Sequence, residues 1–291
     1  LGWVVRFMDR LLNGLAYLAA IVGVLYALFS YARFPENEDA RRPPVSYAEQ
    51  APDVHAPPVD LSEPAFTIQI PKKEASIGTA FAISGGWWLT ARHVADGCDA
   101  IGLVLGPRKG IRAQQVVLHP NADVALMSVH LNPEPFALFK EDLQQGQDGF
   151  AIGYPQGSPG GVYAQLMGRG RMKMRGRYQT DEPVRTWAER KRAPNSLPSL
   201  GGLSGGPMLN ERGEVIGVLV AETMRRGRVY TSDLTSIRWL LEQASVFPNP
   251  YAPLFPLAAD NFVGQGDTLR EDFRITQVFC DVKQPSRRRR L

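Results

Sequence analysis

From Ala65 onward the sequence is a succession of short apolar runs separated by residues that favour turns. Runs of this length are typical of strands and are too short for most helices. Glycine and proline, 28 and 23 of the 291 residues, supply the turns. Strands are expected at Phe66–Ile70, Gly78–Ile83, Trp87–Thr90, Ala100–Leu105, Gln115–His119, Val124–His130, Gly149–Tyr154, Val162–Met167 and Glu214–Ala221. The pattern predicts a mainly β domain of about 180 residues.

One helix is predicted after these strands. Asp233 is a suitable N-cap, and apolar residues follow it at helical spacing up to about Ala244: Leu234, Ile237, Leu240 and Leu241. Residues 246–291 show neither a helical nor a strand period, and we expect a C-terminal extension that wraps on the domain and ends in a loose tail. The net charge of +4 equals the charge of Arg287 to Arg290 in that tail, so the body is formally neutral and no nucleic-acid partner is expected.

The N-terminal region predicts a membrane anchor. Residues 11–32 contain no charged side chain and are long enough as a helix to cross a bilayer, whereas the apolar part of a cleaved signal peptide is usually shorter. Residues 1–10 form a flank, and arginines on both sides of the span leave its orientation open. Residues 33–64 are rich in proline and poor in large apolar residues, which is typical of a linker.

Cys98 and Cys280 are the two cysteines. One disulfide is arithmetically possible, but a domain of this size does not need one, and sequence alone does not show that the two residues meet. The composition favours free thiols and leaves the pairing open.

Three separated segments carry residues with catalytic potential. GTAFAIS at 78–84 and GWWLTARHVADG at 86–97 deliver His93 after a strand, HPNADVALMSV places Asp123 before a strand, and GGLSGGPMLNERGEVIGVLV places Ser204 in a glycine-rich turn. Peptide hydrolysis requires a nucleophile, a group that accepts and returns its proton, and donors for the oxyanion. Ser204, His93 and Asp123 supply the nucleophile, the general base and the group that orients the base. The glycines would let the backbone N–H groups of Gly202 and Ser204 point at one oxygen.

TARHV, NADVAL and GLSGGP, in the order His, Asp, Ser, resemble the trypsin-like serine peptidases, especially the bacterial HtrA-like branch. The resemblance covers about residues 66–244 and predicts a peptidase domain at 65–245. It implies two perpendicular six-stranded barrels with the triad in the cleft between them, followed by the C-terminal helix. No PDZ domain is expected, because the roughly 45 residues after Val246 are too few. An anchor with the protease domain in the periplasm of a bacterial inner membrane is a family-level expectation.

Two positions depart from the digestive enzymes of this family. Leu203 replaces the aspartate that pairs with a newly cut amino terminus, so activation by that ion pair is not expected. Pro198 stands where trypsin has an acid, which removes the counter-charge for Arg or Lys. By the same resemblance Val220, Ala221 and Glu222 wall the specificity pocket, which suggests small or medium apolar substrate side chains; the direction of Glu222 stays open.

The sequence supports a serine endopeptidase that acts on protein or peptide substrates without a cofactor or metal, because it lacks a plausible zinc-ligand set. The alternative is a catalytically silent scaffold that binds peptides or a partner protein in its cleft. A third possibility is an enzyme whose oxyanion turn is ordered only by a partner or by oligomerisation; the oligomeric state is open. The basic segment GRGRMKMRGRYQT at 168–180 is expected to be a solvated hairpin and loop beside the cleft.

Overall fold

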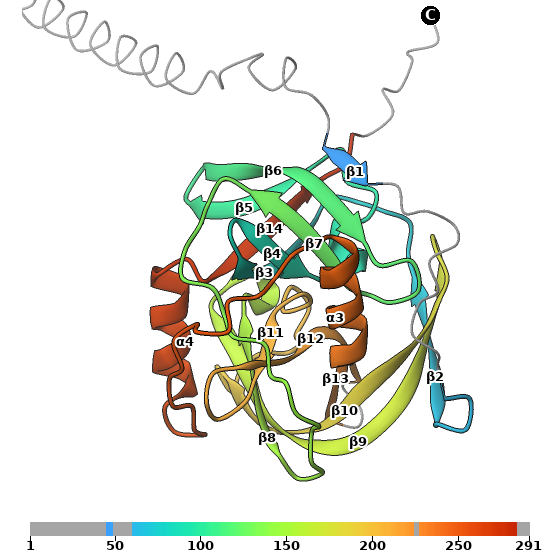
Figure 1. The fold of residues 1–291 in the computed structure, drawn as a ribbon, viewed down its shortest axis with the longest axis vertical. Helices are drawn as coiled ribbons and strands as arrows, with labels where there is room; N and C mark the ends of the chain where they lie inside the picture. Colours follow the sequence, from blue (N-terminus) through green and yellow to red (C-terminus); the bar gives the residue numbers. More distant parts are fainter. Residues whose placement is uncertain (1–44, 49–59, 224–226, 284–291) are drawn as a thin grey trace, which may run out of the picture. The chain divides into compact units, whose positions relative to one another are not determined.

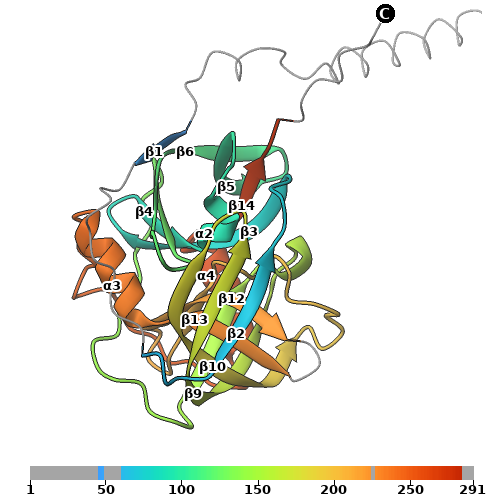
Figure 2. The same ribbon diagram turned by 90° about the vertical axis from the view of Figure 1, so that its right-hand side faces the viewer.

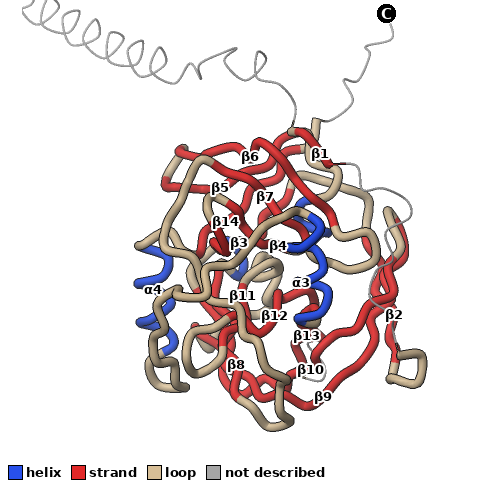
Figure 3. Tube along the Cα trace, viewed as in Figure 1, coloured by secondary structure: helices blue, strands red, loops and turns tan. Residues whose placement is uncertain are grey.

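A computed structural model describes residues 45–48, 60–223 and 227–283. The predicted membrane segment 11–32, most of the linker 33–64 and the arginine tail lie outside these residues. Within the described ranges, no helix has the length and apolarity that a bilayer crossing requires. Strands dominate the described chain and helices are few and short, which confirms the mainly β prediction (Figure 3).

The first sheet closes on itself as a six-stranded barrel with one extra strand (Figure 1). The ring runs β6-β5-β14-β3-β4-β7 and is closed by pairing of β7 with β6, and β1 adds to β6 in parallel. Its strands are β1 (Ser46–Ala48), β3 (Ser76–Ser84), β4 (Trp87–Thr90), β5 (Ala100–Gly106), β6 (Lys109–Leu118), β7 (Ala125–Val129) and β14 (Ile275–Asp281).

The second sheet is built in the same way. The ring β10-β13-β12-β11-β8-β9 is closed by pairing of β9 with β10, and β2 adds to β9 in parallel. Its strands are β2 (Ala65–Ile70), β8 (Asp148–Gly153), β9 (Gly160–Gly176), β10 (Thr180–Ala193), β11 (Pro207–Leu209), β12 (Val215–Thr223) and β13 (Arg228–Ser232). Two six-stranded barrels are the architecture that the resemblance implied.

The last strand of the described residues, β14, belongs to the first barrel. β14 pairs antiparallel with β3 on one side and with β5 on the other, although nearly the whole second barrel lies between them in the sequence. This insertion brings Cys280 next to Cys98, and the two form a disulfide bond. The preference for free thiols is therefore wrong, because it rested on local sequence and the contact depends on a long-range strand pairing.

A short piece of the predicted linker also joins the first barrel. The Tyr47 hydroxyl donates to the carbonyl oxygens of Ala95 and Cys98, at 3.0 and 2.9 Å, and β1 forms a parallel ladder with β6. Val45 and Tyr47 pack against the core of that barrel. The sequence did not predict this contact, because Val45 and Tyr47 are too few apolar residues to show the alternation of a strand in a proline-rich segment.

Within residues 60–223 and 227–283, α-helices lie against the barrels at three places. α2 (Arg92–Ala95) follows β4, α3 (Leu234–Gln243) follows β13, and α4 (Phe262–Glu271) precedes β14. The carboxylate of Asp233 accepts from the Thr235 N–H at 3.0 Å, so the predicted N-cap of α3 is confirmed. The sequence did not predict α4, whose two glycines and weak apolar period hide it.

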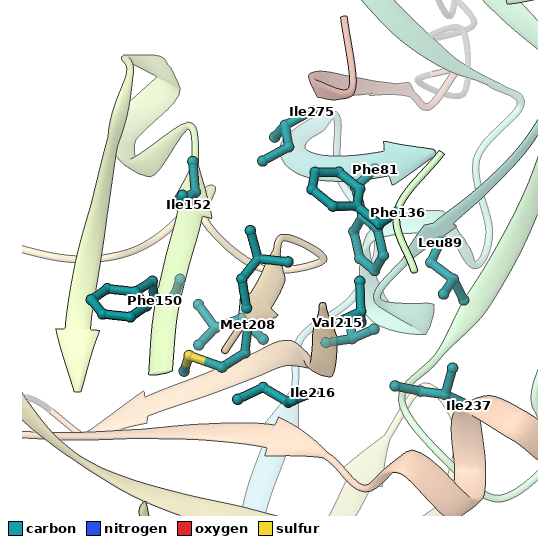
Figure 4. Packing of buried hydrophobic residues seen from close by; sticks show 14 of the residues in the cluster. Phe81, Leu89, Phe136, Phe150, Ile152, Met208, Val215, Ile216, Ile237 and Ile275 are labelled. Atoms are coloured by element: carbon teal, nitrogen blue, oxygen red, sulfur yellow. The ribbon is translucent and has the colours of Figure 1, made fainter. Parts of the chain in front are cut away.

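The largest hydrophobic core joins the two barrels (Figure 4). Phe81 and Leu89 come from the first barrel, and Phe150 and Met208 come from the second. Phe136, from the connection between the barrels, packs edge to face on Phe81 at 5.9 Å between ring centroids. This shared core fixes one barrel against the other, so residues of both can form one site.

The basic segment 168–180 forms the end of a long hairpin. β9 and β10 pair from Gly161–Ala193 to Met174–Thr180, and β2 runs beside β9 (Figure 2). The prediction of a hairpin is correct. The prediction that it is simply solvated is wrong for Arg171, Met172 and Met174, which are buried because β2 and the first barrel cover that part of the ribbon.

Candidate active site

His93 and Asp123 form a close pair within the first barrel. His93 lies on α2 and Asp123 lies just before β7, and 2.6 Å separates the imidazole Nδ1 from the carboxylate Oδ2. The backbone N–H of His93 donates to the other oxygen, Oδ1, at 2.7 Å. The His93 side chain is 26% exposed while that of Asp123 is fully buried. A buried carboxylate that holds one imidazole nitrogen leaves the other free to face solvent or substrate.

The backbone of Asp123 is held from the second barrel. Its N–H donates to Oε1 of Glu182 on β10 at 2.7 Å, and Oε2 of Glu182 accepts from the Ser232 hydroxyl at 3.1 Å. Burial and the nearby Asp123 carboxylate raise the pKa of Glu182 well above its usual range. A neutral Glu182 avoids placing two negative charges side by side in the interior.

Ser204 lies in a tight turn whose glycines are sterically required. Gly202 and Gly205 have φ values of +94° and +87°. A Cβ on Gly202 would lie 2.6 Å from the Tyr154 carbonyl oxygen, and one on Gly205 would lie 2.2 Å from the Thr79 carbonyl oxygen. Only glycine fits both the backbone angle and the space at these two positions.

Thr79 on β3 ties this turn to the first barrel. The Ser204 carbonyl accepts from the Thr79 N–H at 2.9 Å, and the Thr79 hydroxyl donates to the Gly202 carbonyl at 2.8 Å. The same hydroxyl accepts from the Tyr154 N–H at 3.1 Å. Within the described part of the chain, the N–H groups of Gly202 and Ser204 donate no hydrogen bond. The carbonyls of Gly202 and Ser204 are thus held by Thr79, and the N–H groups of these two residues remain free to donate.

A cavity of about 450 Å³ brings the two barrels' contributions together. His93 lines it from the first barrel, and Gly202 and Ser204 line it from the second. Lys73 and Arg177 form part of the wall and donate to the His93 carbonyl at 3.1 and 3.2 Å. Burial and the nearby Arg177 lower the pKa of Lys73 to about 8.

The residues predicted for the specificity pocket lie apart from this cavity wall. Pro198 is exposed, Val220 is buried and Ala221 is half-buried. The Glu222 carboxylate accepts from the Ser199 hydroxyl and from the Leu200 N–H, at 2.9 and 2.7 Å. Glu222 therefore points toward the loop before the serine turn and holds that loop.

Leu203 has an apolar role in the turn. Its side chain is fully buried in the core shared by the barrels, and its N–H donates to the Leu200 carbonyl at 2.8 Å. Hydrophobic packing thus anchors Leu203, which replaces the aspartate that forms an ion pair in the digestive enzymes.

The sequence did not identify three residues that support the site. Thr79 lies in the segment GTAFAIS at 78–84, where the sequence predicts a strand and no functional role. Tyr178 lies in the basic segment 168–180, where the sequence predicts a solvated hairpin and loop. Glu182 has no local signal, because its partners Asp123 and Ser232 lie about 50 to 60 residues away in the sequence. Contacts of this range depend on the closure of both barrels.

His119 is buried behind the Asp123 turn and is a structural histidine. Its Nδ1 accepts from the Asn121 N–H at 3.1 Å, and its ring lies 4.5 Å from that of Trp239 between centroids. Burial and the nearby Arg92 lower the pKa of His119 to about 3.

This pKa predicts a loss of stability in acid. The unfolded chain protonates His119 near pH 6.5 whereas the folded chain does so near pH 3, so stability present above pH 6.5 declines as the pH falls between these values. Between pH 7 and pH 4, protonation of His119 in the unfolded chain lowers the free energy of unfolding by about 3 kcal/mol. Unfolding free energies of the full chain in mild detergent, measured at pH 7 and pH 4, should differ less in His119→Asn than in the wild type. His130→Asn, at an exposed position, is the control; equal pH dependence in the wild type and His119→Asn would contradict the assignment.

About half of the chain is similar in sequence to known serine proteases. Residues 78–218 match the family model described as a trypsin-like peptidase domain. A probable periplasmic serine endoprotease, DegP-like, of Pseudomonas fulva is 32% identical over 150 residues, which are 50% of this chain and 29% of that protein. The serine protease Rv3671c of Mycobacterium tuberculosis is 33% identical over 147 residues, 49% of this chain and 35% of that protein. The chain thus spans about a third of the length of these curated relatives.

A crystal structure of the Rv3671c protease in its inactive form aligns with a TM-score of 0.47 and 25% identity, over 58% of this chain and 87% of that one. The sequence match covers the strands and turns that carry His93, Asp123 and Ser204. The chain therefore contains a region that matches the trypsin-like peptidase domain and is similar to serine proteases of the HtrA/DegP-like kind.

Proposed function

We propose that the protein is a serine endopeptidase in which His93, Asp123 and Ser204 are the catalytic triad. The observation that supports this most strongly is the 2.6 Å imidazole–carboxylate pair at the cavity that Ser204 also lines. A buried carboxylate on Nδ1 fixes the tautomer in which Nε2 accepts a proton. That tautomer is the one a serine nucleophile requires.

The reaction follows from these positions. His93 removes the proton from the Ser204 hydroxyl as its oxygen attacks the carbonyl carbon, and Asp123 stabilises the imidazolium that forms. His93 then donates this proton to the leaving amine as the acyl-enzyme forms. Water repeats the sequence with His93 as the base and releases the acid, which restores Ser204.

The oxyanion would be bound by the N–H groups of Gly202 and Ser204. Both belong to the turn whose carbonyls are held by Thr79, which leaves the N–H groups free to face the cavity. Donors fixed before the reaction stabilise the developing negative charge without reorganisation. No metal or other cofactor takes part in this scheme.

As the family resemblance implies, we propose that Pro198, Val220, Ala221 and Glu222 border a specificity subsite that is separate from the cavity lined by His93 and Ser204. Because Glu222 is engaged by Ser199, Leu200 and the guanidinium of Arg192 at 3.6 Å, its charge is compensated within the protein. The other three residues are small and apolar; Val220 is buried in the core, Ala221 is half-buried and Pro198 is exposed. We therefore expect cleavage after small or medium apolar residues in place of Arg or Lys.

The cellular setting is part of the proposal. Residues 11–32 would anchor the chain in the bacterial inner membrane, the linker 33–64 would space it from the surface, and the peptidase domain 65–245 would face the periplasm. The periplasmic naming of the DegP-like relatives supports this side of the membrane. The disulfide between Cys98 and Cys280 also suits an oxidising compartment.

Cleavage of an unfolded protein separates the enzyme from a silent scaffold. The full chain in mild detergent is incubated with a reduced, denatured protein, and the products are identified by mass spectrometry. We expect new peptide termini after small apolar residues, and no products after pretreatment with a serine-directed sulfonyl fluoride. Binding of the substrate without cleavage would favour the scaffold; cleavage only after addition of membrane fractions would favour activation by a partner.

A further inference from the structure

The end of the β9–β10 hairpin, residues 174–182, reaches from the second barrel onto the catalytic face of the first. Its side chains contact both members of the His93–Asp123 pair: the Arg177 guanidinium donates to the His93 carbonyl, and the Tyr178 hydroxyl donates to the Asp123 carboxylate. Asn121 and Asp181 exchange two hydrogen bonds, with the Asn121 amide nitrogen 2.9 Å from the Asp181 carbonyl and the Asp181 N–H 3.0 Å from the Asn121 oxygen. This reciprocal contact fixes the hairpin end beside Asp123.

Tyr178 at this hairpin end touches Asp123 directly. Its hydroxyl donates to Asp123 Oδ1 at 3.1 Å, the oxygen that also accepts from the His93 N–H. The thioether of Met174 lies farther from the same hydroxyl, at 3.8 Å, and a thioether is a weak acceptor. Burial and the Asp123 charge raise the pKa of Tyr178, which keeps the phenol protonated and able to donate.

The Tyr178 ring is held independently of this hydrogen bond. The Arg92 guanidinium stacks over it at 4.1 Å from the ring centroid, and Arg92 also donates to the carbonyls of His119 and Pro120 at 2.7 and 2.9 Å. A phenylalanine would keep this stacking. Replacing Tyr178 by phenylalanine would therefore remove the hydrogen bond to Asp123 and leave the ring in place.

We propose that Tyr178 is a positioning residue for the triad: its hydroxyl binds Asp123 Oδ1 and so holds Oδ2 in line with His93 Nδ1. The inference rests on the proposed peptidase function. With Oδ1 held by two donors, rotation of the carboxylate would cost both bonds, and Oδ2 stays on the imidazole. Loss of the Tyr178 donor leaves one restraint, the His93 N–H.

The test is the rate at which Ser204 reacts with a fluorophosphonate, which requires the triad but no knowledge of the natural substrate. Tyr178→Phe in the full chain should lower the maximal rate constant about tenfold, the effect of one hydrogen bond to a charged group. The concentration for half-maximal rate should stay unchanged, because the cavity is not altered. The thermal unfolding midpoint should fall by only a few degrees, because one hydrogen bond is lost, and the protein should remain folded.

Tyr163→Phe is the matched control. Tyr163 also donates to an aspartate, Asp148 Oδ1 at 3.0 Å, on the second barrel and outside the catalytic cavity. The Tyr163→Phe variant should react with the fluorophosphonate at the wild-type rate. A Tyr178→Phe rate within twofold of the wild type, or equal losses in both variants, would overturn the inference while the peptidase proposal stands. A wild-type chain that fails to react would overturn the proposed function and the inference with it.

A second readout separates positioning from general stability. The nuclear magnetic resonance signal of the proton between His93 Nδ1 and Asp123 should shift or broaden in Tyr178→Phe and be unchanged in Tyr163→Phe. An unchanged signal in Tyr178→Phe would contradict the inference even where the rates differ, because the proposed action is on this hydrogen bond.

Discussion

Asp123→Asn should lower kcat for peptide cleavage by about four orders of magnitude while the protein remains folded. Oδ1 of Asp123 accepts from two donors, the His93 N–H and the Tyr178 hydroxyl. The asparagine oxygen must take this place, which directs its amide nitrogen at His93 Nδ1. An N–H donor there forces the hydrogen of the imidazole onto Nε2, and His93 then cannot accept a proton from Ser204.

The measurement is kcat for a peptide identified by the cleavage assay, with the thermal unfolding midpoint recorded in parallel. Asp148→Asn is the control, since Asp148 likewise accepts from a tyrosine hydroxyl and from a second side chain, that of Gln165, on the second barrel. It should retain full activity. An active Asp123→Asn protein would show that the carboxylate is not the orienting group.

Gly202→Ala should lower kcat by a factor of about 100 to 1,000, which is less than the loss in Asp123→Asn and is the effect of losing one oxyanion donor. The added Cβ would lie 2.6 Å from the Tyr154 carbonyl oxygen, and the φ of +94° is unfavourable for alanine. The turn must move to relieve this contact, and its N–H then leaves the oxyanion position. Binding of substrate should change much less than kcat.

Gly146→Ala separates backbone strain from displacement of the turn. Gly146 has a φ of +84°, close to that of Gly202, but a Cβ there meets no atom within 4 Å. This variant should lose about 1 kcal/mol of stability and no activity. Equal kcat values for Gly202→Ala and the wild type would remove Gly202 from the oxyanion site.

Local sequence was sufficient where a residue's role depends on its neighbours. The positions of His93 after a strand, of Asp123 before one and of Ser204 among glycines follow from short segments, and so does the Asp233 cap of α3; the triad role of the first three is the proposal made above. All nine expected strands are present, because β-branched and alternating apolar residues favour a strand whose one face packs against a core. β9 is longer than expected, since its charged end is covered by β2.

Features that depend on distant pairing could not be predicted. β14 pairs with β3 and β5, which lie about 170 to 200 residues earlier in the sequence, and this pairing places Cys280 beside Cys98. The support that Tyr178 and Glu182 give to Asp123 crosses between the barrels in the same way. No spacing rule relates residues whose proximity is created by the packing of one barrel on the other.

The central claim is that Ser204 is a nucleophile activated by His93. Its most direct measurement is the mass of the full chain after reaction with a fluorophosphonate, with the modified peptide mapped by fragmentation. We predict one adduct, on Ser204, that is absent from Ser204→Ala and forms very slowly in His93→Ala. An unmodified Ser204 in folded protein, or an adduct that forms equally fast without His93, would contradict the claim.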